Sequence, residues 1–86
     1  MSVAVAEIVD QLRSFLVERH QLPKGAPLEE STGLLGQGIG LDSVEALQLV
    51  GQMEEAFHLT IGDEELDAAH FMTVGTFVSF IVSHLV

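Results

Sequence analysis

Cysteine is absent from this 86-residue sequence, and basic residues are scarce. Without cysteine the chain has no disulfide framework, no thiolate nucleophile and no cysteine-ligated zinc site. Three Lys and Arg stand against 13 Asp and Glu, which gives a formal net charge of -10, and no Lys or Arg follows Lys24. Nucleic acids and anionic membrane surfaces bind clustered Lys or Arg and are therefore poor partners. A protein with a basic patch is the expected partner.

Long apolar runs are also missing. None approaches the roughly 18 residues that a membrane span needs, and the first ten residues carry Glu7 and Asp10 without a basic start. We therefore expect a cytoplasmic location. A chain of this length forms one small domain over residues 1–86 and buries only about 60% of its unfolded surface. That leaves little room for a catalytic pocket, so we expect a non-catalytic protein. We also expect it to be a monomer.

Apolar residues recur at intervals of three and four along three segments, which predicts three amphipathic helices. We expect them over Val3–Arg19, over Ser43–Phe57, and over Val74–Leu85 with Thr73 as N-cap. An Asp cap and an acidic first turn predict a fourth, short helix over Asp63–Ala69.

A long connection over residues 20–42 joins the first two predicted helices. It holds both prolines of the chain and five of its eight glycines, interspersed with leucines that predict packing across the helices. No segment alternates cleanly between apolar and polar residues, so no sheet is expected. The predicted fold is all-α, a small four-helix bundle with a long loop. Asp42 and Glu45 predict a capping box that starts the helix at Ser43.

Two features resemble catalytic or nucleotide-binding motifs but lack the required context. The run Gly36–Gly40 leads into a helix, yet no strand precedes it and no Lys follows, which disfavours a nucleotide site. Ser43 as a hydrolytic nucleophile would need His58 or His70 as its base and flanking glycines that the sequence does not have.

The metal-binding patterns are equally incomplete. Residues 63–67 are rich in Asp and Glu but lack the spacing of a calcium loop, so we expect loose cation binding and no dedicated metal site. The histidines show no metal-ligand spacing and are interpreted as helix-end or surface residues: His20, His58, His70 and His84.

The stretch Gly40-Leu41-Asp42-Ser43-Val44-Glu45-Ala46-Leu47 resembles the acyl carrier protein family. The order of elements agrees with that family over nearly the whole chain: a helix, a long loop, Asp-Ser-Val at a helix start, a short acidic helix and a last helix after Thr73. The size and the acidity of the chain agree as well.

This resemblance implies that Ser43 is the attachment point of 4'-phosphopantetheine, which a separate phosphopantetheinyl transferase moves from coenzyme A. The chain would then carry acyl groups as thioesters and present them to acyl-loading and acyl-processing enzymes. A first-turn serine suits a phosphodiester, because the start of a helix is the positive end of its dipole. Asp42 is the N-cap beside it.

The resemblance also implies that the outer face of this helix docks onto basic patches of partner enzymes. The predicted docking residues are Val44, Glu45, Leu47, Gln48, Gly51, Glu54 and Glu55. Val44, Gln48 and Gly51 depart from the commonest fatty-acid carriers, which favours a specialised fatty-acid or polyketide-type pathway.

An alternative function of a different class is an unmodified small acidic helical adaptor that docks on a basic partner protein. The acidity and the helix pattern are also compatible with this adaptor. Only covalent modification by a transferase separates the two functions.

The net charge makes a first prediction. Ten unbalanced negative charges repel one another and favour the expanded state, so millimolar Mg²⁺ or moderate NaCl is expected to raise the melting temperature. Thermal unfolding followed by circular dichroism across both titrations measures this. A midpoint that stays constant in both would contradict it.

Overall fold

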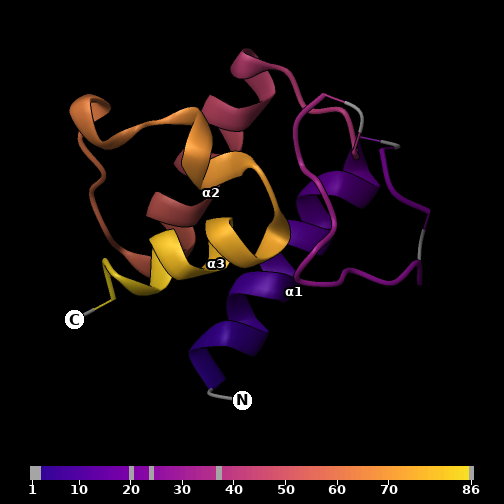
Figure 1. Cartoon of the computed structure of the whole chain (residues 1–86). Helices are drawn as coiled ribbons and strands as arrows, with labels where there is room; N and C mark the ends of the chain where they lie inside the picture. Colours follow the sequence, from indigo (N-terminus) through magenta and orange to yellow (C-terminus); the bar gives the residue numbers. More distant parts are fainter. Residues whose placement is uncertain (1–2, 20, 24, 37, 86) are drawn as a thin grey trace.

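The computed structural model describes residues 3–19, 21–23, 25–36 and 38–85 (Figure 1). Its three α-helices are α1 (Val3–Glu18), α2 (Ser43–Phe57) and α3 (Val74–Val82). Within these ranges no residue belongs to a β-strand and only two isolated bridges form, so the predicted all-α fold is confirmed. None of the described helices is long and apolar enough to cross a membrane. Six residues lie outside the description: Met1, Ser2, His20, Lys24, Gln37 and Val86.

The predicted short helix over Asp63–Ala69 is wrong in form. The structure has two separate 3₁₀ turns there, η1 (Asp63–Glu65) and η2 (Ala68–Phe71), in place of a fourth α-helix. Leu66 and Asp67 between them are extended, and the Asp67 carboxylate accepts the Ala69 N–H at 2.9 Å to start η2. A segment this short gains too few hydrogen bonds to offset helix nucleation.

The ends of the long helices differ slightly from the predicted ones. α1 ends one residue early, at Glu18, and α3 ends at Val82, three residues before Leu85. The Phe80 carbonyl explains the second difference, because it accepts the Ser83 hydroxyl at 2.6 Å and lies 2.9 Å from His84 Nδ1. The His84 N–H turns to the Ile81 carbonyl instead, and the α-helical pattern stops.

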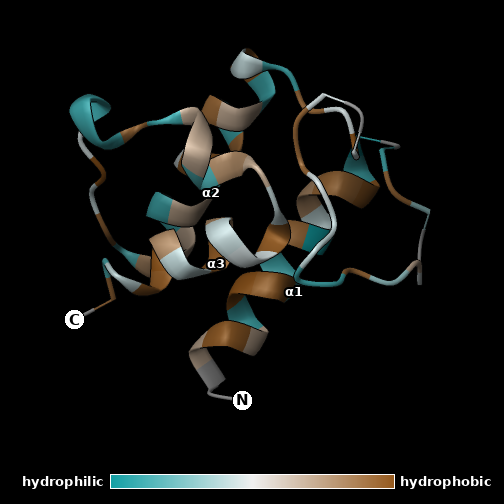
Figure 2. Ribbon diagram, in the orientation of Figure 1, coloured by the Kyte–Doolittle hydropathy of each residue, from teal (hydrophilic) through white to brown (hydrophobic). Residues whose placement is uncertain are grey.

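The apolar faces of the three helices meet in one core, as their spacing predicts (Figure 2). Each helix contributes residues that are nearly inaccessible to solvent, and burial of such side chains contributes about 1.5–3 kcal/mol each before entropy is subtracted. The buried helix residues are Ile8, Leu12, Phe15, Leu16, Ala46, Leu49, Val50, Met53, Val74, Phe77, Val78, Phe80 and Ile81.

The described residues between α1 and α2 run without a helix or strand but are held at several points. Residues 30–34 pair antiparallel with residues 72–75 through the Val74 N–H to the Thr32 carbonyl (2.8 Å) and the Leu34 N–H to the Met72 carbonyl (3.2 Å). The Arg13 guanidinium on α1 donates to the Ala26 carbonyl. The connection therefore packs across the helices, as its leucines predict.

A tight turn brings this connection to the start of α2. The Ile39 N–H donates to the Gly33 carbonyl at 2.8 Å, and the Leu41 N–H donates to the Leu34 carbonyl at 2.9 Å. Gly38 lies so close to Gly33 that a Cβ at Gly38 would be 2.2 Å from the Gly33 carbonyl oxygen. The backbone approach therefore requires glycine at position 38.

A second prediction compares this glycine with Gly51 on α2, around which a Cβ would meet nothing within 4 Å. Gly38→Ala is expected to lower the free energy of unfolding by about 1–3 kcal/mol through overlap, whereas Gly51→Ala raises it by up to about 1 kcal/mol through helix propensity. Denaturant melts of both variants measure this. Equal shifts in the same direction would contradict it.

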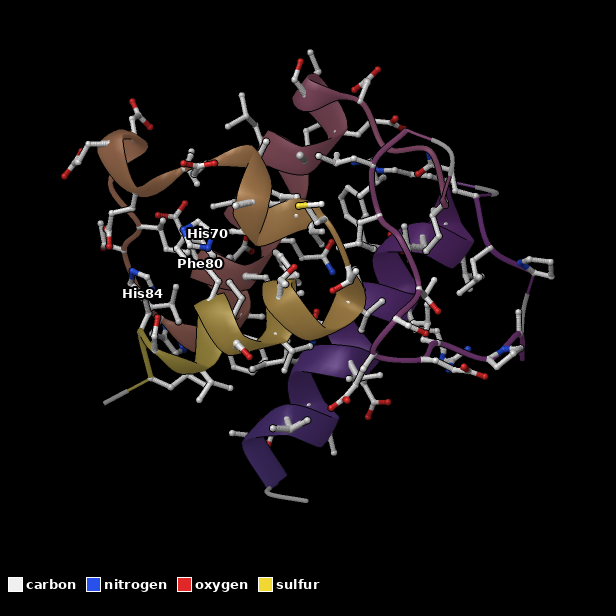
Figure 3. All side chains as sticks on the ribbon, in the orientation of Figure 1. His70, Phe80 and His84 are labelled. Carbon is white, nitrogen blue, oxygen red and sulfur yellow. The ribbon has the colours of Figure 1, made fainter. Side chains whose placement is uncertain are left out.

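His84, two residues after α3, joins this helix to η1 (Figure 3). Its Nε2 lies 2.9 Å from Glu65 Oε1 and its Nδ1 lies 2.9 Å from the Phe80 carbonyl, while the His70 ring stacks on Phe80 at 4.1 Å. Both partners of His84 are acceptors, so both ring nitrogens donate and the imidazolium form is favoured.

The pKa values of this pair shift accordingly. The Phe80 carbonyl and, after it, the Glu65 carboxylate raise the pKa of His84. The Gly62 N–H and, after it, His84 lower the pKa of Glu65. Because the Glu65 side chain is 44% exposed, salt screens the pair.

A third prediction follows from these directions. The stabilisation by protonated His84 is complete below the ordinary histidine pKa and is lost as pH rises through the raised pKa of His84 in the folded chain. The stabilisation by the Glu65 carboxylate is lost only in acid, as pH falls through its lowered pKa. The free energy of unfolding of His84→Gln should be lower than that of wild type at about pH 6. The difference should largely disappear by about pH 9. Urea melts across this range measure the difference.

The control for His84→Gln is His58→Asn. His58 is exposed at the end of α2 with φ 55°, a left-handed conformation that asparagine tolerates. Parallel stability curves for wild type and His84→Gln across the pH range would refute a role for the His84 proton.

Candidate functional site

The start of α2 is fixed by a reciprocal pair of side-chain hydrogen bonds. Asp42 Oδ1 accepts the Glu45 N–H at 2.8 Å, and Glu45 Oε1 accepts the Asp42 N–H at 3.1 Å. The predicted capping box is therefore confirmed, and Ser43 is the first residue of the helix. Leu41, just before the cap, is buried and bridged to Leu35, so the helix start is anchored in the core.

Ser43 itself is exposed, and its hydroxyl forms no hydrogen bond with any residue that the structure describes. It lies in the first turn of a 15-residue helix, where backbone N–H groups lack carbonyl partners within the helix. The combined geometry is a hydroxyl that is accessible to a partner protein at the positive end of a helix dipole.

An apolar groove of about 390 Å³ opens beside Ser43. It lies between the end of the connection, the first two turns of α2 and the segment that joins η1 to η2, and Asp67 is its one charged lining residue. Leu47 at the groove is 55% exposed. The lining residues are Leu35, Leu41, Ser43, Ala46, Leu47, Leu66, Asp67, Ala68 and Phe71.

Of the histidines that the structure describes, none forms a hydrogen bond with Ser43. His58 caps the other end of α2, which at 1.5 Å per residue is roughly 20 Å away. His70 stacks on Phe80 of α3. Neither ring has a hydrogen bond to Ser43, so the part of the chain that the structure describes gives this serine no base of the kind that a hydrolytic triad uses. Nor do any three His, Asp or Glu residues of the described ranges form a group that could hold a metal ion.

The predicted docking residues on α2 fall into two groups. Val44, Leu47, Gln48, Gly51 and Glu55 are exposed, with Val44 61% accessible.

Glu45 and Glu54 carry structural hydrogen bonds. Glu45 closes the capping box, and Glu54 Oε2 accepts the Ile61 N–H at 2.9 Å across the turn after the helix. The sequence predicted the Glu45 bond as part of the capping box but gave no sign of the Glu54 bond.

Most of the groove beside Ser43 was not predicted from the sequence. Leu35, Leu66 and Phe71 come from three different segments, and no local pattern links them. Met72, which is 62% exposed, was also missed. Its position just before the Thr73 cap, outside the periodic face of α3, is the one sequence signal that marks it as an exposed apolar residue.

The fold and the site define a small helical protein with an accessible serine at a helix start. A family model described as the phosphopantetheine attachment site matches residues 25–81. This range covers well over half of the chain, so the chain belongs to the phosphopantetheine attachment family.

Membership establishes the cofactor, which is 4'-phosphopantetheine attached covalently, typically to a serine. Domains of this family are generally non-catalytic carriers, and they interact with a phosphopantetheinyl transferase and with acyl-handling enzymes. The residues here fit the group, because an unbonded hydroxyl is the chemical partner of a phosphodiester and an apolar groove lies next to it.

Proposed function

We propose that this chain is a discrete acyl carrier protein that bears its 4'-phosphopantetheine on Ser43. Three serines lie in the matched range: Ser31, Ser43 and Ser79. Ser31 lies in the connection and Ser79 in the middle of α3, so Ser43 alone of the three begins a helix. This placement carries the assignment.

The local electrostatics support a phosphodiester at this position. Attachment would bond Ser43 Oγ to phosphorus, release the adenosine bisphosphate part of coenzyme A and pass the hydroxyl proton to the transferase. The positive end of the α2 dipole favours the resulting negative charge. Asp42 and Glu45 oppose it, but Asp42 is exposed and solvent screens its charge.

Acyl groups would be carried as thioesters on the thiol of the arm, and the absence of cysteine leaves no protein thiol to capture them. The apolar groove beside Ser43 offers the arm and its cargo a surface away from water. The chain's own role in this proposal is to position the arm and to present it, without a catalytic step.

The outer face of α2 would dock onto basic patches of the transferase and of acyl-loading and acyl-processing enzymes. Val44 and Leu47 supply exposed apolar contacts there, and Glu55 supplies negative charge. Gln48 and Gly51 differ from common fatty-acid carriers, which favours a specialised fatty-acid or polyketide-type pathway. A single cytoplasmic domain that works as a monomer completes the proposal.

The fourth prediction tests the attachment site. After incubation with coenzyme A and a broad-specificity phosphopantetheinyl transferase, intact mass spectrometry should show one phosphopantetheine on the wild-type chain. Ser43→Ala should gain none. The matched control, Ser79→Ala, should be modified as wild type is, because Ser79 is also exposed but lies mid-helix.

The outcomes separate the two candidate functions. Modification of Ser43→Ala would refute the assigned residue. A wild-type chain that stays unmodified with several active transferases would favour the unmodified acidic adaptor.

A further inference from the structure

A second, polar groove of about 740 Å³ lies between α1 and α2. The two helices are joined at its side by Gln52, whose Nε2 donates to the Gln11 backbone carbonyl at 3.2 Å and to Gln11 Oε1 at 3.1 Å. The groove is lined by Gln11, Ser14, Glu18, Gln48, Gly51, Gln52, Glu55 and Ala56.

The two acidic residues of the groove lie toward its opposite ends. In Figure 1, α1 rises from the N-terminus, whereas α2 begins at the top and descends. Glu18 is the last residue of α1 and Glu55 is in the last turn of α2. Because the helices run in opposite directions, these carboxylates bracket the groove, with Ser14 and Gly51 between them.

Gly51 leaves the middle of the groove open. It is exposed, and a Cβ at this position would meet nothing within 4 Å. Glycine inside a helix is less favourable than alanine. No contact within the described chain requires this glycine, and its missing side chain lets another backbone come close to α2.

The two carboxylates of the groove lie where they destabilise the helices that carry them. Carboxylates near the C-terminal ends of helices meet the negative end of the dipole, and neither α1 nor α2 has a basic residue in its last turn. The two nearby arginines have other partners: Arg13 of α1 donates to the Ala26 carbonyl, and Arg19, just after α1, lies over the Phe15 ring at 4.2 Å. No residue lining the groove is basic.

We propose that this groove is a docking surface for a basic segment of a partner protein, which places Lys or Arg beside Glu18 and Glu55 and lays its backbone over Gly51. Cations there would gain from both carboxylates and both helix ends, while Gln48, Gln52 and Ser14 offer polar groups to the segment's backbone. That the partner is an acyl-handling enzyme rests on the proposed carrier function. The docking surface then extends from α2 onto α1.

The fifth prediction tests the groove with a defined probe, a synthetic peptide with two arginines that flank a run of small residues, and its counterpart with glutamine in place of arginine. Titration into the ¹⁵N-labelled full chain without its cofactor should shift the amides of Gly51, Ser14 and Gln11. The glutamine peptide should not shift them. Added salt should weaken binding, because the contacts are exposed charges.

Substitutions then locate the binding. Glu18→Gln and Glu55→Gln should each weaken the peptide about two- to fivefold, as loss of one exposed ion pair does. Gly51→Met should weaken it by obstruction while leaving the helix content unchanged. The matched control is Glu7→Gln, which removes the same charge from an exposed position of α1 outside the groove.

Each result decides the proposal. Equal effects of Glu18→Gln and Glu7→Gln, or shifts centred on residues 63–67 rather than on Gly51, would overturn it. These measurements use the unmodified chain, so they do not depend on Ser43. Phosphopantetheine attachment to the same variants is measured separately, so a failed groove and a failed carrier function give different results.

Discussion

The antiparallel pairing of residues 30–34 with residues 72–75 is the constraint on which the arrangement of this protein depends. It holds the connection before α2 against the start of α3, although the two are distant in sequence. Leu34 is fully buried at this pairing, and hydrogen bonds in such a water-poor environment are stronger than exposed ones. The tight turn at Gly38 continues from this pairing and brings Leu41 to the Leu34 carbonyl, so the pairing positions the start of α2 and with it Ser43.

The acidity of the chain has two distinct uses. Several carboxylates hold backbone groups in place: Asp42 and Glu45 cap α2, Glu54 accepts the Ile61 N–H, and Glu65 joins Gly62 to His84. Glu18 and Glu55 have no such bond among the described residues and face solvent. The net charge does not distinguish these two groups of carboxylates. Only carboxylates such as Glu18 and Glu55, which hold no backbone group that the structure describes, can pair with a partner protein without loss of a structural hydrogen bond.

α2 separates two grooves of different chemistry. The groove beside Ser43 is apolar and is lined by Ala46 and Leu47 from this helix, whereas the groove shared with α1 is polar and is lined by Gln48, Gly51 and Gln52. Under the proposed function, the first suits an acyl cargo and the second a basic protein segment. One helix would thus place cargo and partner on neighbouring faces.

The amino-acid sequence by itself determined the helices, the capping box and the family, because periodic apolar spacing and an Asp-x-x-Glu cap act over one or two helical turns. It also singled out Ser43 and Gly51. It did not determine the 3₁₀ form of residues 63–71, the early end of α3 or the structural bonds of Glu54. The two grooves are likewise formed by segments that meet only in the folded chain. Local propensity carries no information about which distant side chains become neighbours, so only the tertiary structure decided the grooves.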